Sequence, residues 1–356
     1  MTSHRTYSFL LASGYAEASE PTVAGFELDE ATGELQPRGT LTGIASPSFM
    51  VVHPGGELYL TSETPDGAVL ALRLGQQPGA ATELSRQPSG GDWPCHLLFS
   101  PDGHYLAVAN YGSGTARLFP RLSDGSLGLP GPIAHHAGRG PHPDRQEGPH
   151  AHATIFSPDG RFTIVADLGL DRLKTYTIGE GGVLQPAGEG VVHAGAGPRH
   201  MAWHPTGHLL YVANELDSSV SSFAFDPSSG ALTEIAQIST IPPGAPHNQV
   251  ADIHLDARGE RLYVSNRGHN SIAVYQVAAD GQLSLLAIRS CGGDWPRNFA
   301  LSPGGGYLIV ANQHSGKLAV LPIIDGLEAL GDPVALAPLP GARCVIFPSV
   351  AVGWGR

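Results

Sequence analysis

Short apolar segments alternate with polar turns along almost the whole chain. The segments occur in pairs joined by a turn of the Ser-Pro-Asp-Gly kind, as in HLLFSPDGHYLAVAN at 96–110 and ATIFSPDGRFTIVAD at 153–167. Apolar runs of this length, bounded by glycine-containing turns, predict β-strands joined as hairpins, because helices need longer segments with a 3.6-residue period. We therefore expect an all-β protein.

The hairpin unit recurs six times at intervals of roughly fifty residues, a period at which repeated strands indicate a β-propeller with one four-stranded sheet per blade. Each copy continues into a Ser- or Gly-rich loop and a further strand. The copies are recognised by the residue at the hairpin turn, which is Pro54, Pro101, Pro158, Pro205, Ala257 or Pro303.

The two ends of the chain together supply a seventh unit. YSFLLASGYA at 7–16 and TVAGFELDEATGELQ at 22–36 resemble second and third strands without a first strand, whereas CVIFPSV at 344–350 resembles a first strand without followers. Pairing them closes the ring and removes exposed sheet edges. We predict one seven-bladed domain over residues 1–356; the alternative is an open sandwich of the same hairpins.

Composition and charge narrow the function classes. The chain has 47 Gly and 30 Pro, a content that suits an all-β chain with many tight turns. Its formal net charge of -12 disfavours nucleic acid and membrane surfaces as partners. Three widely spaced cysteines indicate neither a disulfide framework nor a zinc site, and a cytoplasmic location fits best. The apolar stretch near the N-terminus is read as a first strand rather than a signal peptide.

The repeat separates scaffold from candidate site, because the start of each first strand and the end of each second strand lie on one face of a propeller. Nine residues after the turn proline, Asn recurs four times and is expected to cap loop backbone. Six residues before the turn residue, the side chain varies from small to cationic. That position holds Ser48, Cys95, His152, Arg199, Ala251 and Arg297, with Ala342 in the closing unit.

Polar residues from most blades thus converge on one mouth of the channel, where we expect a ligand pocket. The spacing predicts that His152 faces Asp167, with His150 on the same face of the strand. Glu215 follows Asn214, which the same spacing pairs with Arg199. The position five before the turn proline adds His200 and Asn298, and Arg343 occupies it in the closing unit; Arg267 lies ten after its turn residue.

Several interpretations of these residues remain open. His-x-His with nearby carboxylates can hold zinc, but arginines at the same mouth would repel a dication, so no metal or other cofactor is expected. The arginines either form a structural ion-pair network with Glu215 and Asp167 or recognise an anion. Trp93 and Trp295, in duplicate GGDWP segments, are expected to pack between blades.

The runs RQEGPHAHATIFSPDG at 145–160, GPRHMAWHP at 197–205, NEL at 214–216 and DWPRNFALSP at 294–303 resemble the seven-bladed lactonase family. That family includes propeller-type 6-phosphogluconolactonases and is similar to carboxy-cis,cis-muconate cyclases. The resemblance covers essentially every blade. It places the family's proposed site on His150 or His152, Arg199 and Glu215, which the repeat had already singled out.

The resemblance implies hydrolysis of 6-phosphogluconolactone to 6-phosphogluconate, in the pentose phosphate pathway, without a metal. Such a site needs a base for water and a cation for the oxyanion. We assign Glu215 or His152 to the base, Arg199 to the oxyanion, and Arg267 with Arg297 to phosphate. Alternatives are a lactonase or cycloisomerase for another carboxylated ring, a calcium-dependent gluconolactonase, and a non-catalytic scaffold.

Overall fold

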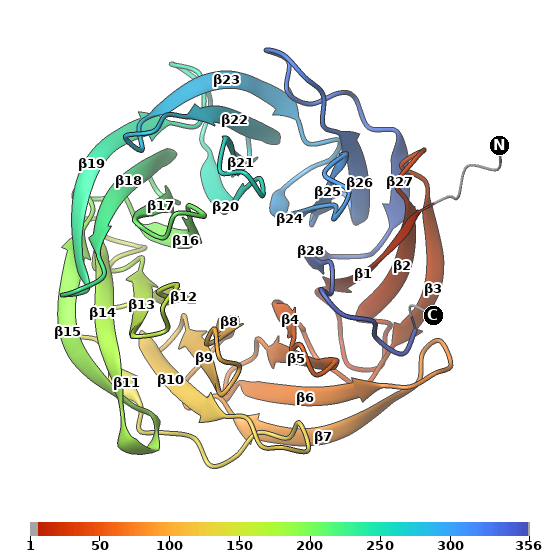
Figure 1. The fold of residues 1–356 in the computed structure, drawn as a ribbon, viewed down its shortest axis with the longest axis horizontal. Helices are drawn as coiled ribbons and strands as arrows, with labels where there is room; N and C mark the ends of the chain where they lie inside the picture. The colour runs from red at the N-terminus through yellow and green to blue at the C-terminus, as the bar shows by residue number, and fades with distance from the viewer. Residues whose placement is uncertain (1–5, 355–356) are drawn as a thin grey trace.

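Seven four-stranded antiparallel sheets form a closed ring in the computed structural model, which describes residues 6–354 (Figure 1). The predicted all-β, seven-bladed propeller is confirmed. One 3-10 turn, Glu180–Gly182, interrupts the strands of the described chain. Each blade is named here by its innermost strand.

The strands follow in chain order, and β28 joins the blade of the first three. They are β1 (Tyr7–Gly14), β2 (Val23–Asp29), β3 (Leu35–Leu41) and β28 (Ala342–Ile346); β4 (Met50–Val52), β5 (Glu57–Ser62), β6 (Ala68–Leu74) and β7 (Ala81–Pro88); β8 (Pro94–Phe99), β9 (Tyr105–Asn110), β10 (Thr115–Pro120) and β11 (Ala134–His135); β12 (Ala151–Phe156), β13 (Phe162–Asp167), β14 (Arg172–Gly179) and β15 (Val183–Val191); β16 (Pro198–Trp203), β17 (Leu209–Asn214), β18 (Ser219–Asp226) and β19 (Ala231–Ser239); β20 (Gln249–Leu255), β21 (Arg261–Arg267), β22 (Ser271–Val277) and β23 (Leu283–Ser290); β24 (Pro296–Leu301), β25 (Tyr307–Asn312), β26 (Lys317–Pro322) and β27 (Ala335–Pro338).

The Ser-Pro-Asp-Gly turns of the β8 and β12 blades are held by local hydrogen bonds. Between β12 and β13, Ser157 Oγ donates to Asp159 Oδ1 at 2.6 Å and accepts the N–H of Phe162 at 3.0 Å. Gly160 takes a φ of 71°, a left-handed conformation that costs glycine little. The turn is therefore specified by its own four residues, independently of the rest of the ring.

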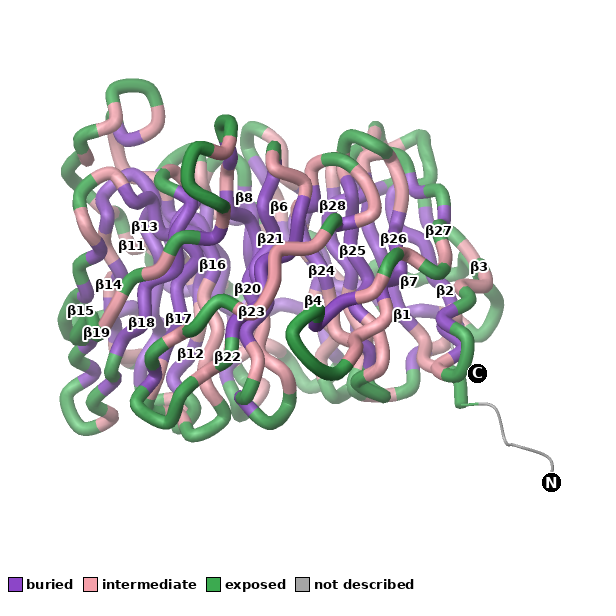
Figure 2. Tube along the Cα trace, turned by 90° about the horizontal axis from the view of Figure 1, so that it is seen from above, coloured by how far each residue is buried: buried purple, intermediate pink, exposed green. Residues whose placement is uncertain are grey.

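The hydrophobic cores lie between neighbouring blades. Each of the seven apolar clusters combines strands of two adjacent sheets, so that every blade packs against both neighbours. Seen from the side, the central strands are buried while loops at both ends of the ring are exposed (Figure 2). The recurrent Asn residues are buried, and their amides bond nearby carbonyl or hydroxyl groups: Asn266 Nδ2 donates to Thr240 O at 2.9 Å, whereas Asn214 Nδ2 donates to the hydroxyls of two serines in β18. Their expected scaffold role is confirmed.

The ring closes between the two ends of the chain. In β28, Ile346, Val345 and Cys344 pair with residues 11–13 of β1, as the sequence predicts. The neighbouring blade adds a second tie, because Asn298 Oδ1 accepts the N–H of Val345 at 2.7 Å. A side-chain hydrogen bond thus joins the last strand to the blade before it.

The innermost strands other than β4 carry a β-bulge or register shift near their starts. In the β12 blade, Ala151 rather than His152 pairs with Asp167, because an extra residue shifts the register by one. The predicted placement of His152 opposite Asp167 is therefore wrong, and for the same reason Pro198 rather than Arg199 pairs with Asn214. Equivalent irregularities place three other channel residues in bulges, namely Cys95, Arg199 and Arg297.

Removing residues 344–356 should open the ring. The deletion takes away most of β28 and exposes the edge of β1 together with apolar surface, so we expect an aggregated or loosely packed product. Solubility, near-UV circular dichroism and thermal melting measure the effect. A soluble truncated protein with native melting would show that the ring does not depend on this strand.

Candidate active site

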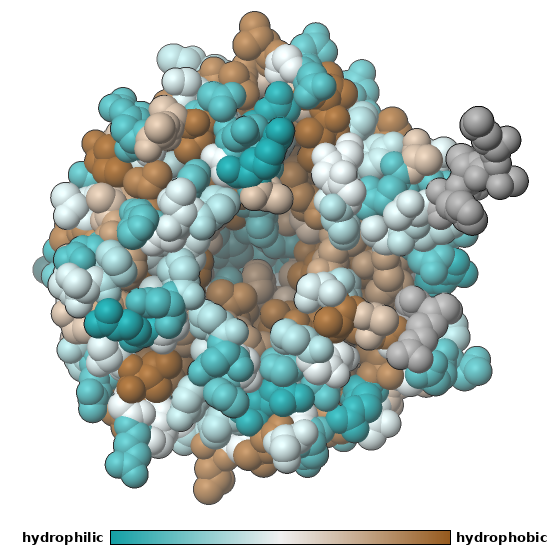
Figure 3. Space-filling model, viewed as in Figure 1, coloured by the Kyte–Doolittle hydropathy of each residue, from teal (hydrophilic) through white to brown (hydrophobic). Residues whose placement is uncertain are grey.

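The ring is hollowed at its centre (Figure 3), and a cavity of about 420 Å³ lies where innermost strands begin and second strands end. Four of the ten candidate site residues from the sequence border it directly. The lining includes His152, Glu215, Arg267 and Arg297 from the predicted set, together with Tyr15, Glu63, Trp93, Cys95, Tyr111, Arg145, Gln249 and Trp295.

Glu215 is the electrostatic centre of this mouth. Its carboxylate is 3% exposed and is held by three arginines from three different parts of the chain. Arg145 Nη2 donates to Oε1 at 2.6 Å, and Arg267 Nη2 donates to Oε2 at 2.6 Å. Arg199 Nε lies 3.0 Å from the same Oε2. Both oxygens are therefore occupied by cations.

These cations decide the protonation state of Glu215. Burial would raise the pKa of its carboxyl, but the charges of Arg267, Arg199 and Arg145 outweigh burial and hold the pKa well below its ordinary value. So weak a base, with both oxygens paired, is poorly suited to abstract a proton from water. Its position instead orients and partly neutralises the arginines.

Arg145 was not among the residues predicted from the sequence. It lies in the segment between β11 and β12, which is longer than the connections in other blades and belongs to no repeated position. Besides Glu215, Arg145 bonds the hydroxyl of Tyr111 at 3.2 Å. The unusual length of the segment was the one sign in the sequence that it could have a special role. The contact of Arg145 with Glu215 across the channel mouth, however, depends on the tertiary structure.

Asp171 holds this segment next to Arg199. Gln146 is fully buried, and its Nε2 donates to Asp171 Oδ1 at 2.7 Å. The same carboxylate accepts the N–H groups of Gly195 and Gly197, at 2.7 and 2.9 Å, just before the strand that carries Arg199. One buried carboxylate thus positions the supports of two arginines that meet at Glu215.

His152 lines the cavity as a neutral imidazole. Burial lowers its pKa well below the ordinary value, and the charges of Arg199 and neighbouring cationic groups act in the same direction. Cys95 lies beside it, with Sγ 3.2 Å from the carbonyl of His152, and burial raises the pKa of that thiol to about 12. Near neutral pH the histidine retains a free lone pair, whereas the cysteine is not a thiolate.

Asp167 serves the neighbouring segment rather than His152. Its Oδ2 is bonded to Nδ1 of His136, and its Oδ1 accepts the N–H of His150 at 2.8 Å. The carboxylate of Asp167 therefore holds His136 and His150 in place of His152, which the sequence predicted it to face. His150 stacks on Tyr111 at 4.5 Å between ring centroids and bonds the carbonyl of Tyr111 at 3.0 Å. His150 therefore supports Tyr111, which lines the cavity, without lining the cavity itself.

The cationic residues differ in access to the cavity. Arg199 is 2% exposed and donates through Nη1 to Ala251 O, so it lies behind the lining. Arg343 is paired with both oxygens of Glu63, at 2.8 and 3.0 Å. Within residues 6–354, Arg297 has neither an ion pair nor a hydrogen bond, although it borders the cavity. Arg297 is thus the guanidinium available to an incoming anion.

His200 and Asn298, predicted to bind substrate, instead lie deeper in a hydrogen-bonded belt. His200 Nδ1 is 2.7 Å from Asp252 Oδ1, and Asn298 Nδ2 donates to Asp252 Oδ2. Because Asn298 also bonds Val345, the belt joins the innermost strands of four successive blades. His200 and Asn298 therefore link neighbouring blades by hydrogen bonds, at a level below the mouth.

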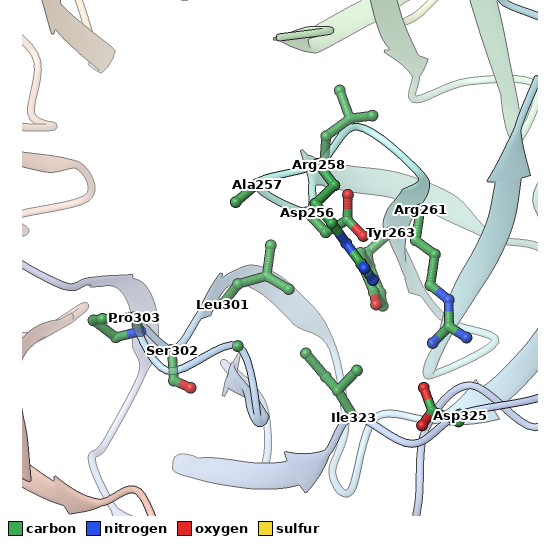
Figure 4. Close-up of a pocket in the computed structure, with 12 residues that line it drawn as sticks. Asp256, Ala257, Arg258, Arg261, Tyr263, Leu301, Ser302, Pro303, Ile323 and Asp325 are labelled. Carbon is green, nitrogen blue, oxygen red and sulfur yellow. The ribbon is translucent and has the colours of Figure 1, made fainter. Parts of the chain in front are cut away.

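Another cavity, of about 520 Å³, lies at the hairpin turns of the β20 and β24 blades, the opposite end of the strands from the mouth (Figure 4). Its charged groups include Asp256, Arg258, Arg261 and Asp325. Arg258 pairs with Glu260, and Arg261 donates to a loop carbonyl. It contains none of the predicted site residues, so the chemistry is assigned to the mouth.

Two features are absent from residues 6–354. No group of three or more His, Cys, Asp or Glu side chains there is arranged to hold a metal ion. Within the same range, no helix has the length and apolarity needed to cross a membrane.

One channel mouth of a closed seven-bladed propeller thus combines a neutral histidine with a cluster of guanidinium groups, the kinds of group that ester hydrolysis uses as base and as oxyanion partner. Residues 9–347 match the family described as Lactonase, 7-bladed beta-propeller, and the chain belongs to that family. It is accordingly a lactonase, a hydrolase that acts on lactone esters.

Named relatives share nearly the whole length. A 6-phosphogluconolactonase of Bacillus subtilis is 35% identical over 310 residues, covering 86% of this chain and 88% of that protein. A 6-phosphogluconolactonase of Formosa agariphila is 30% identical, with 83% and 86% covered. The solved structure of a periplasmic gluconolactonase from Pseudomonas aeruginosa superposes with a TM-score of 0.90, at 27% identity, covering 97% of this chain and 100% of that one.

The buried histidine makes stability depend on pH. Since the pKa of His152 in the folded protein lies well below 6.5, the unfolded chain takes up a proton there that the native protein does not. The free energy of unfolding should fall as pH decreases below 6.5, by up to about 1.4 kcal/mol per pH unit for each such proton. Urea unfolding between about pH 7.5 and about pH 5 should show a smaller slope for His152→Gln. Equal slopes would contradict the depressed pKa.

Proposed function

We propose that the protein hydrolyses a sugar lactone that carries an anionic group, and that this substrate is 6-phosphogluconolactone. The observation that carries the proposal is Arg297, an unpaired guanidinium that borders a cavity whose other charged lining groups, Arg145, Arg267, Glu63 and Glu215, are all in ion pairs. Guanidinium binds phosphate or carboxylate through two parallel N–H donors. Arg297 would therefore hold the group that distinguishes the phosphorylated lactone.

His152 is the general base of the proposed reaction. Its neutral imidazole takes a proton from water while the water oxygen attacks the lactone carbonyl, forming a tetrahedral oxyanion. When the ring C–O bond breaks, the imidazolium returns the proton to the leaving alkoxide. The products are a hydroxyl group and a carboxylic acid on one chain, so atoms and protons balance without a cofactor.

Arg267 is the better placed cation for the oxyanion. It lines the cavity, and its attachment to Glu215 and to Val250 O at 2.9 Å holds it in one orientation before substrate arrives. Arg199, to which the sequence assigned this task, acts through Glu215 by contributing to the same ion-pair group. Arg145 closes the group from the opposite side.

The names of relatives support a lactone substrate but differ on phosphate. The proteins of Bacillus subtilis and Formosa agariphila are named for the phosphorylated lactone, whereas the Pseudomonas aeruginosa structure is named a gluconolactonase. Purified enzyme assayed on both lactones, corrected for spontaneous hydrolysis, tests the proposal. A higher kcat/KM for the phosphorylated lactone supports it, and equal values or a preference for gluconolactone would overturn the phosphate assignment.

His152→Gln should lower kcat by about 100-fold or more, because it removes a general base while keeping a polar side chain of similar size. Since the pKa of His152 in the free protein lies well below 6.5, the wild-type kcat/KM, which reports ionisations of the free enzyme, should show no loss from this histidine when pH is lowered through 6.5. His150→Gln, which alters the supporting wall, should cost less. If His152→Gln retains near-native kcat and melts normally, another group is the base.

Arg297→Gln should raise KM for the phosphorylated lactone by about tenfold or more and change kcat much less, because the lost contact is made in ground and transition states alike. KM for unphosphorylated gluconolactone should change little. Arg258→Gln, an exposed arginine at the opposite end of the ring, is the matched control. Equal losses on both lactones would exclude a phosphate-binding role.

A further inference from the structure

Trp93 stands at a backbone position that repeats around the ring. The carbonyl at this position accepts the N–H of the residue that follows, or ends, the second strand of its blade. Four of these hydrogen bonds, each 2.7–3.0 Å long, join Ser46 to Glu63, Trp93 to Tyr111, Gly197 to Glu215, and Trp295 to Gln313. The structural equivalence of the four residues therefore rests on a shared contact and not only on sequence spacing.

The repeated position requires a left-handed backbone in these blades. The φ angles are 45° at Ser46, 54° at Trp93, 67° at Gly197 and 65° at Trp295. Glycine adopts this conformation without steric cost, whereas a large side chain there is an outlier. The need for a positive φ at this position explains why Gly197 occupies it, but it does not explain the tryptophans at 93 and 295.

Packing does not account for Trp93. Its side chain is 45% exposed and borders the mouth cavity, so the expected role in packing between blades does not hold for this residue. A strained backbone that is not compensated by burial points to a function at the site. Gly112 makes room for the ring, since a Cβ there would lie 3.2 Å from Cε3 of Trp93.

Trp295, in the duplicate segment, has a different environment. Its ring stacks on His314 with centroids 4.5 Å apart, and the guanidinium of Arg267 lies 5.5 Å from its centroid. Trp295 is thus engaged by neighbours and helps to hold Arg267. No ring or cation contact of this kind is found for Trp93 among residues 6–354, so its indole remains available at the cavity wall.

We propose that Trp93 is a specificity-determining residue whose indole face receives the C–H-bearing face of the substrate's sugar ring. The inference rests on the proposed lactonase site and specifies the substrate as cyclic. Arginines of the cavity can bind the polar groups of a sugar ring, but they offer no apolar surface for its carbon-bound hydrogens. The flat face of an indole offers that surface, because carbon-bound hydrogens pack against an aromatic face. An acyclic ester of equal charge presents no such face.

The decisive variant is Trp93→Gly, which removes the indole and relieves the backbone at once. We expect KM for the sugar lactone to rise about tenfold with kcat changed less than threefold, while the melting temperature stays within about 2 °C of wild type. A packing role predicts instead a large drop in melting temperature with unchanged KM. Trp93→Phe, which keeps a smaller flat ring, should restore part of the affinity.

Ser46→Gly is the matched control, because it relaxes the same backbone position in a blade whose residue does not line the cavity. It should leave KM unchanged. A tenfold rise of KM in Ser46→Gly would show that backbone relaxation, not the indole, causes the effect. An unchanged KM in Trp93→Gly would overturn the proposal outright.

A binding measurement separates this inference from the proposed function. Wild-type protein and Trp93→Gly are titrated calorimetrically with gluconate and with 6-phosphogluconate, the ring-opened products, and with gluconolactam as a stable ring. If wild-type protein hydrolyses no lactone, the proposed function fails, and the inference still stands only if Trp93→Gly weakens binding of the ring. A loss confined to the open-chain acids would contradict ring stacking.

Discussion

Closure of the ring by β28 is the constraint on which the rest of the structure depends. Each blade packs its apolar faces against two neighbours, and the two clusters that flank the first blade are incomplete until β28 joins it. Closure also completes the mouth, because Arg343 on β28 pairs with Glu63 and lies over the ring of Tyr15 at 3.6 Å. Stability and site geometry therefore depend on the same joint.

The β-bulges place side chains of the repeated scaffold at the channel mouth, where they can form a site. A regular strand would direct alternate residues into the packing between blades and pair every residue with the second strand. The extra residue leaves Cys95, His152, Arg199 and Arg297 without ladder partners near the channel axis. Since the same irregularity recurs from blade to blade, different side chains can be presented at the mouth while the cores remain similar.

The charged side chains of the mouth include a paired group around Glu215 and an unpaired arginine, Arg297. Glu215 and its three arginines neutralise one another in part and form a rigid unit, which burial in a low-dielectric surrounding makes costly to break. Arg297 stands outside this unit. In the proposed reaction, an anion can therefore bind Arg297 without separating an existing ion pair, and the neutral His152 accepts the proton from water.

The amino-acid sequence by itself determined the seven-bladed ring, its closing strand and the convergence of His152, Glu215 and Arg267 on one mouth. These features follow from short hairpins whose turns and apolar periods are encoded locally and repeated. Only the tertiary structure decided which charges pair. The bulge moved Asp167 away from His152, and the non-repeated segment before β12 brought Arg145 to Glu215. Such contacts join residues far apart in the chain, and no local spacing specifies them.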